Sequence, residues 1–143
     1  MVDRPVLIPI LLCTLVFGCT RSDTDGEQPR LSFWRGTSKS GDIVATVAPE
    51  RGSPQLNKFQ AWTLQLRRKD GAAVYPARIG INGGMPEHGH GLPTQPEVTD
   101  YLGDGKYRIE GLKFNMMGTW ALLFVVDTPR GKDRVQVDVV LEW

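Results

Sequence analysis

The sequence has only two cysteines, Cys13 and Cys19, and both lie among its first nineteen residues. The rest of the chain therefore has no disulfide to hold the fold and no thiolate to act as a nucleophile or metal ligand. Stability must come from a packed hydrophobic core. A chain of 143 residues with 41% hydrophobic residues can form such a core as a single domain.

The chain also lacks an excess of charge of either sign. Seventeen Lys and Arg residues balance sixteen Asp and Glu residues, which leaves a net charge of +1. This balance excludes a basic face for nucleic acid and an acidic block for a basic partner. The sequence also has no apolar run of about 20 residues, the length that a membrane-spanning helix needs. Its longest apolar run, Val6 to Phe17, is about a dozen residues.

That apolar run has the length of the central region of a secretory signal peptide. Arg4 places a weak positive charge before it, and Val16-Phe17-Gly18-Cys19 follows it. This tetrapeptide is typical of a lipobox, in which a small residue precedes a cysteine that is lipidated and becomes the mature N-terminus. We therefore predict a bacterial lipoprotein with a signal peptide over residues 1–18 and a lipid on Cys19. A plain secretory signal is the alternative.

A lipid on Cys19 predicts that the membrane itself is a partner and that the protein lies in the cell envelope, facing the periplasm. We expect the outer rather than the inner membrane. Residues 19–41 are mostly polar and are predicted to be a lipidated cysteine followed by a flexible tether, in which Leu31, Phe33 and Trp34 are expected to dock on the domain. The domain itself is predicted over residues 42–143.

From residue 42 onward, apolar and polar residues alternate with the period of half-buried antiparallel strands. Glycine, proline and aspartate separate the alternating segments, and no helical periodicity of useful length is present. Seven strands are predicted, over 42–48, 58–67, 73–83, 96–101, 105–114, 118–127 and 133–143. The fold class is therefore all-β, with a single immunoglobulin-like antiparallel β-sandwich of about seven strands.

Three turns and one irregularity refine this prediction. Hairpin signals lie at 69–71, 103–105 and 128–132. In the fifth predicted strand the apolar phase changes between Ile109 and Leu112, with Gly111 between them. A phase change at a glycine predicts a β-bulge.

Strand direction predicts which loops meet. If consecutive strands run antiparallel, the connections alternate between the two ends of the sandwich. The loops over 49–57, 84–95 and 115–117 then share one end. This end collects both histidines and all three methionines of the predicted domain. Loops at the end of a rigid sandwich commonly carry binding groups.

The segment Met85-Pro86-Glu87-His88-Gly89-His90-Gly91 contains both histidines of the chain. If the backbone were extended, His88 and His90 would point to the same side about 7 Å apart, within reach of one metal ion. Imidazole suits copper and zinc, and thioether sulfur favours Cu(I). Met85 or the methionines at 116 and 117 would therefore favour copper over zinc. Glu87 is a further candidate, as a hard ligand or as a group that orients a histidine.

Two other interpretations of this segment stay open. Glycine and proline around polar residues also make an ordinary structural turn, and Met116 and Met117 can simply cap the core. The same methionines could instead form an adaptable surface for a protein partner. An enzyme is not expected, because all five serines lie in the tether or the first loop, away from the histidines in sequence.

The residues around this segment resemble a known family. Gly-Gly-Met-Pro-Glu-His-Gly-His-Gly-Leu-Pro-Thr-Gln-Pro over 83–96 is similar to the signature of the YtkA-like proteins, which are related to the FixH group. The segment from Gly103 to Met116, followed by Gly118-Thr119-Trp120, is similar as well. The family commonly has Met-Pro where this chain has Met116-Met117. The clear resemblance covers about residues 73–127.

The resemblance implies an exported immunoglobulin-like β-sandwich from a group associated with copper handling and the assembly of respiratory oxidases. Residue by residue, it points to Met85, His88, His90 and Met116 as copper ligands, with Met117 the weakest candidate. The expected function is an envelope-anchored lipoprotein with a Met/His copper site, and the expected partner is a copper-receiving or respiratory membrane protein. The alternative is a metal-free binding or assembly module that docks a membrane complex through the same loops.

Overall fold

The computed structural model describes residues 32–142. The predicted signal peptide, the lipidation site Cys19, most of the tether and Trp143 lie outside the described residues. Within the described part, no helix is long and apolar enough to cross a membrane.

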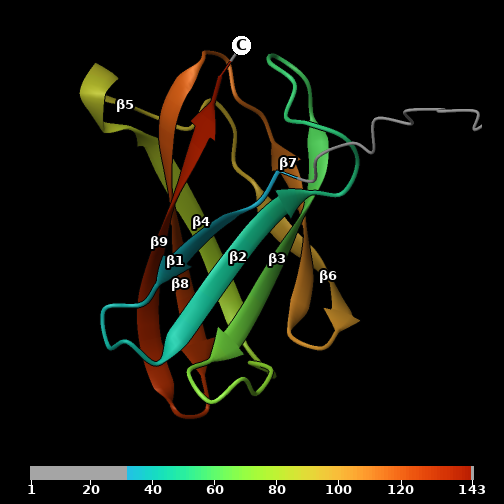
Figure 1. The fold of residues 1–143 in the computed structure, drawn as a ribbon, viewed down its shortest axis with the longest axis vertical. Coiled ribbons are helices and arrows are strands. Elements are labelled where there is room, and N and C mark those ends of the chain that lie inside the picture. Colours follow the sequence, from blue (N-terminus) through green and yellow to red (C-terminus); the bar gives the residue numbers. More distant parts are fainter. Residues whose placement is uncertain (1–31, 143) are drawn as a thin grey trace, which may run out of the picture.

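Two antiparallel sheets pack face to face (Figure 1). The larger sheet has the strand order β1-β2-β3-β7-β6 and the smaller sheet has the order β5-β4-β8-β9. The strands are β1 (Trp34–Thr37), β2 (Ile43–Pro49), β3 (Gln60–Arg68), β4 (Arg78–Met85), β5 (His90–Gly91), β6 (Glu97–Gly103), β7 (Lys106–Leu112), β8 (Gly118–Thr128) and β9 (Gly131–Leu141). A single 3₁₀ turn, η1 (Pro86–His88), lies between β4 and β5.

The prediction of an immunoglobulin-like β-sandwich is confirmed. Without β1 and β5, the seven remaining strands correspond to the seven predicted ones, with shifted bounds. They divide into the groups β2-β3-β7-β6 and β4-β8-β9. This is the division of strands found in constant-type immunoglobulin domains, with four strands in one sheet and three in the other.

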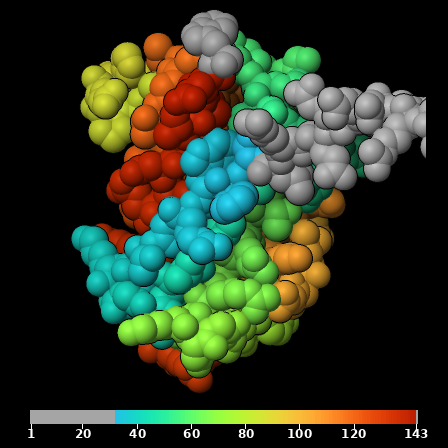
Figure 2. Space-filling model, viewed as in Figure 1, coloured from blue at the N-terminus to red at the C-terminus, as the bar shows by residue number. Residues whose placement is uncertain are grey.

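The domain begins earlier than the predicted boundary at residue 42. Residues 34–37, which were assigned to the flexible tether, form β1 and pair with β2 from Trp34↔Val47 to Thr37↔Val44. β1 also passes close to the other sheet, because an added Cβ at Gly36 would lie 1.8 Å from the carbonyl oxygen of Gln136. Figure 2 shows β1 on the surface between the C-terminal strand and β2. The prediction that Trp34 docks on the domain is confirmed, but the same prediction for Phe33 is wrong, because its side chain is 59% exposed.

The start of the third predicted strand was also wrong. β4 begins at Arg78 rather than at residue 73. Tyr75 falls within the predicted strand over 73–83, but its side chain is 61% exposed and its ring stacks on Tyr101 at 4.1 Å. Period-two spacing cannot separate a strand from an extended approach to it, since both place alternate residues on one side.

The inner faces of the two sheets form one continuous core. β8 lies between β4 and β9 in the smaller sheet. The two largest fully buried side chains are Trp62 on β3 and Trp120 on β8, and each makes a ring contact with Phe114. The core therefore extends to the end of the sandwich at which β8 begins.

The predicted bulge and two of the predicted hairpins, at 103–105 and 128–132, are confirmed. Residues 69–71 form a turn as predicted, but this turn leads from β3 to β4 in the other sheet and does not join a pair of neighbouring strands. Gly71, Gly103 and Gly131 all have positive φ angles. Gly111 has φ 78°, and the register of β7 against β3 shifts beside it, from Trp62↔Ile109 to Gln60↔Leu112. A glycine at positive φ with one extra residue on its strand is the geometry of a β-bulge.

Candidate functional site

The segment that follows β4 is folded back and is not extended. Pro86 opens the 3₁₀ turn η1, and Gly89 ends it in the left-handed conformation at φ 66°. The chain then returns as β5 and pairs with the end of β4 through Gly84↔Gly91 and Met85↔His90. The expectation of an extended His-X-His arrangement is therefore wrong, because proline and glycine fold the backbone at this point.

Glycine at position 84 allows β5 to approach this closely. An added Cβ at Gly84 would lie 2.3 Å from the carbonyl oxygen of His90 and 2.8 Å from the Cα of Gly91. Real Cβ atoms do not tolerate such distances to backbone atoms. His90 can therefore lie at this position only because residue 84 on the neighbouring strand β4 is a glycine.

His90 is held in one tautomer by a backbone contact. Its Nδ1 lies 3.1 Å from the carbonyl oxygen of Gly91. A carbonyl can only accept, so Nδ1 carries the proton and donates it. In the neutral ring the other nitrogen, Nε2, is then left with a free lone pair, which is the form that binds metal. Nε2 lies 3.3 Å from the Sδ of Met116.

Met116 reaches His90 from the loop between β7 and β8, twenty-six residues further along the chain. The indole Nε1 of Trp120 donates a hydrogen bond to the Met116 carbonyl oxygen at 3.1 Å. The Trp120 ring also lies 5.6 Å from the His90 ring, in an edge-on arrangement. The predicted meeting of the two loops is confirmed.

The contact of Trp120 with the site was not predicted from the sequence. The available signal was its position, four residues after Met116 and near the start of β8. The apolar character of this strand predicts that Trp120 is buried but does not say which loop it contacts.

Met85 lies beneath His90. These two residues are direct partners across an antiparallel pair, so their side chains share the inner face of the sheet. Met85 is completely buried, whereas His90 is exposed. The Met85 methyl group occupies the space beside Gly118, where an added Cβ would lie 2.8 Å from it. Met85 is therefore part of the core and also of the floor of the site.

His88 and Glu87 lie on the outer side of the site. Both are exposed in η1. The His88 ring lies 6.1 Å from the His90 ring and is tilted by 35° to it. No group of three or more His, Cys, Asp or Glu side chains with the spacing of a metal site occurs in residues 32–142. Glu87 therefore does not complete a site with the two histidines.

Met117 turns away from this cluster. It lines a different hollow of about 400 Å³, between the start of β1 and the end of β9, together with Ser32 and Leu56. Its rank as the weakest candidate ligand agrees with this placement. Because Ser32 and Met117 line one hollow, the described chain begins at the same end of the sandwich as the candidate site.

The spacing of the His90 and Met116 donors fits one bound ion. Metal bonds to imidazole nitrogen and to sulfur are about 2.0 Å and about 2.3 Å for zinc and are similar for other first-row ions. Two such bonds at the tetrahedral angle of about 109° place nitrogen and sulfur about 3.5 Å apart. The observed separation of Nε2 and Sδ is 3.3 Å, which is close to this value. One nitrogen and one thioether sulfur form a donor set that suits copper better than zinc.

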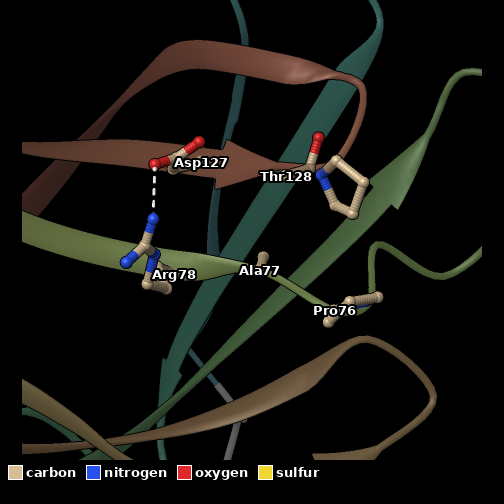
Figure 3. Close-up of a pocket in the computed structure, with 6 residues that line it drawn as sticks. Pro76, Ala77, Arg78, Asp127 and Thr128 are labelled. Atoms are coloured by element: carbon tan, nitrogen blue, oxygen red, sulfur yellow. Dashed lines mark hydrogen bonds and ion pairs between the residues drawn. The ribbon is translucent and has the colours of Figure 1, made fainter.

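Two hollows lie at opposite ends of the sandwich. A hollow of about 320 Å³ lies beside the cluster and is lined by Met85, His90 and the glycines of β4. A hollow of about 380 Å³ at the opposite end is lined by Pro76, Ala77, Arg78, Asp127, Thr128 and Pro129. Figure 3 shows that the charged groups of this second hollow, Arg78 and Asp127, point toward each other at 3.5 Å. The lining of this second hollow includes no histidine, cysteine or methionine, so the His90 cluster remains the better candidate for a metal site.

Comparison with known proteins identifies a family. The model of the YtkA-like family matches residues 37–124, which is more than half of the chain. The match includes β2 to β7 and both loops of the His90 cluster. No curated protein and no solved structure matches the chain.

Proposed function

The chain belongs to the YtkA-like family, and from this and the geometry of the His90 cluster we propose that it is an envelope-anchored lipoprotein that binds copper. The proposed ligands are Nε2 of His90 and Sδ of Met116, with His88 and Met85 as the nearest further donors. In this proposal the protein handles copper for a membrane partner, such as a copper-receiving or respiratory protein. No catalytic role is proposed.

The observation that carries the proposal is the pairing of Nε2 and Sδ at 3.3 Å with the histidine tautomer fixed. Two donors that are already arranged bind an ion without a cost for reorganising the loops. His90 and His88 are exposed, so an ion at this position would be accessible to a partner protein. Accessible soft ligands suit transfer of copper rather than permanent storage.

The proposed anchor is consistent with this role. If Cys19 carries the lipid, the segment from Cys19 to Ser32 spans at most roughly 45 Å even when fully extended. Ser32 lies at the same end of the sandwich as the proposed site. The anchor would therefore keep the copper-binding end near the membrane surface. Incorporation of labelled fatty acid, lost in a Cys19→Ser variant, tests the anchor separately.

The copper proposal is tested by titrating the full-length chain in detergent with Cu(I), without oxygen, and with Cu(II). We expect one ion per chain. Substituting a residue that only supports a metal ligand lowers metal affinity by about 10–100-fold. Removing a ligand, as in His90→Ala, should therefore lower copper affinity by at least about 100-fold. Met116→Leu should weaken Cu(I) binding more than Cu(II) binding, because the thioether is the soft ligand.

Met117→Leu is the matched control, since it changes the neighbouring methionine, which lies in another hollow. It should leave copper affinity unchanged. Wild-type binding weaker than about 1 mM, which is about −4 kcal/mol, would contradict the proposal. Equal affinities of the wild type and His90→Ala would contradict it as well.

A metal-free docking module is the second candidate. The specific observation in its favour is the exposure of two phenylalanines at this end of the sandwich, Phe33 at 59% and Phe59 at 67%. Exposed aromatic side chains are enriched at the centres of protein interfaces. In this case the wild type would bind no copper, and a Phe33→Ser/Phe59→Ser variant would lose binding to the membrane partner.

A further inference from the structure

Trp120 stands between the core and the two proposed donors. Its side chain is completely buried, and it contacts the cluster at two points. Its N–H donates to the Met116 carbonyl oxygen, and its ring lies against the His90 ring. On its other side the ring packs on Phe114 at 5.3 Å. One rigid side chain therefore connects both donors to the core of the sandwich.

The hydrogen bond to Met116 has a consequence for its thioether. Met116 lies in a short loop between β7 and β8, and its flexible side chain could adopt many rotamers. Fixing the carbonyl group of Met116 fixes the direction in which its Cβ leaves the backbone. The contact between Trp120 and His90 restricts the imidazole from the inner side. Both restrictions favour the arrangement in which Nε2 faces Sδ.

We propose that Trp120 is a positioning residue that makes the His90/Met116 pair select Cu(I) over Cu(II) and Zn(II). This inference rests on the proposed copper function and adds the oxidation state. Trp120 acts in two ways: it holds the soft donor Met116 in place, and it keeps water and oxygen ligands away from the inner side of the ion.

The selectivity follows from what each ion requires. Zn(II) takes four ligands, and Cu(II) favours nitrogen and oxygen donors in a tetragonal arrangement. On the inner side of the pair the neighbours are Trp120 and Met85, both with an exposed fraction of 0%. Neither of these two supplies an oxygen or nitrogen ligand. Cu(I) binds soft donors, so these apolar neighbours hardly lower the affinity for Cu(I). They do lower the affinities for Cu(II) and Zn(II).

The experiment compares Trp120→Phe with Trp62→Phe in the full-length chain. Trp62 is the matched control because it is equally buried and also contacts Phe114, but it lies on β3 and not beside His90. Affinities for Cu(I), Cu(II) and Zn(II) are measured for both variants, together with unfolding in urea. Loss of one hydrogen bond and one ring contact predicts a loss of about tenfold in Cu(I) affinity in Trp120→Phe. Affinity for Cu(II) and Zn(II) should change by less than about threefold.

A second measurement does not depend on the folding of Trp120→Phe. In the Trp62→Phe chain, Cu(I) should quench the tryptophan emission, and addition of Met116→Leu should reduce the quenching. Equal losses for all three ions in Trp120→Phe, an equal Cu(I) loss in Trp62→Phe, or no Cu(I) quenching would overturn the role of Trp120 while the copper proposal stands. Absence of Cu(I) binding in the wild type would overturn both.

Discussion

The two ends of the sandwich are built by different means. At one end, tight hairpin turns over 103–105 and 128–131 join β6 to β7 and β8 to β9, and a turn over 69–71 begins the crossing from β3 in one sheet to β4 in the other. At the other end, the connections are longer, and segments far apart in sequence meet there, as in the contact between His90 and Met116. We refer to these as the hairpin end and the site end.

The hairpin end is held by polar contacts that are mutually satisfied. Arg67 pairs with Asp104, Arg68 pairs with Asp42, and Arg78 pairs with Asp127. Buried Tyr107 donates its hydroxyl to the Val74 carbonyl oxygen at 2.6 Å, and burial raises the pKa of this phenol to about 12. Groups that satisfy one another have little capacity left for a ligand.

The site end leaves a nitrogen lone pair and a thioether facing each other above an apolar floor. Neither group is the preferred hydrogen-bond partner of the other, since thioether sulfur is a weak acceptor. Local turn chemistry therefore specifies the stable hairpin end. At the site end, tertiary packing brings together donors that are incompletely satisfied, which indicates a binding site.

The largest effect is expected from an alanine at the site end. Gly84→Ala places a Cβ against the backbone of β5 and must push this strand away. We expect a loss of about 3 kcal/mol in the free energy of unfolding and a large loss of copper affinity. Gly80→Ala on the same strand is the control, because its Cβ would meet only Val125 at 3.9 Å. Unfolding in urea and copper titration measure the two effects, and equal behaviour of the two variants would refute the account of β5.

A similar substitution at the hairpin end should separate stability from binding. Gly105 has φ 70°, and an added Cβ would lie 2.4 Å from the Leu66 carbonyl oxygen. Gly105→Ala should cost about 2–3 kcal/mol of stability but leave copper affinity unchanged at temperatures where the protein is folded. Gly103→Ala is the control, because it meets only the strain of φ 86°. A copper affinity that falls with Gly105→Ala would show that the two ends are coupled.

The ion pair between Glu50 and Arg108 at the site end predicts a pH dependence. The guanidinium donates to both carboxylate oxygens, at 2.7 and 2.9 Å, and this bonding lowers the pKa of Glu50 below its usual value of 4.5. A lowered pKa in the folded state stabilises the fold above pH 4.5, and this contribution is lost as the pH falls through the folded-state pKa.

Glu50→Gln should therefore destabilise the protein by about 1 kcal/mol at pH 7, since the pair is partly exposed. The difference from the wild type should shrink below pH 4.5. Urea unfolding between pH 3 and pH 7 measures it. A difference that stays constant over this range would contradict the assigned pKa direction.

The smallest effect is expected from the exposed ion pair at the hairpin end. The Arg78 side chain is 91% exposed, and it meets Asp127 at 3.5 Å. Exposed pairs of this kind contribute about 0–1 kcal/mol, so Arg78→Ala should change stability by less than about 0.5 kcal/mol. Thermal unfolding of the variant measures this change. A larger loss would contradict this assignment, because it would mean that the Arg78–Asp127 pair in Figure 3 stabilises the fold more than an exposed ion pair does.

Much of this architecture follows from the sequence. Alternation of apolar residues predicts the seven main strands, turn glycines predict the hairpins, and the phase change at Gly111 predicts the bulge. These features depend on residues close together in the chain, where backbone geometry links spacing to shape. The antiparallel order of the strands also predicts that His90 and Met116 lie at one end.

Strand β1 and the detailed geometry of the site depend on the tertiary structure. Sequence spacing did not reveal that residues 34–37 form a strand, because their pairing partners lie on β2 and near β9. It also did not distinguish His90 from His88, and only the family resemblance ranked Met116 above Met117. That choice depends on the hydrogen bond to Gly91, the bond from Trp120 and the space left by Gly84. Such contacts are set by distances of a few tenths of an ångström between elements far apart in the chain, and no local pattern contains them.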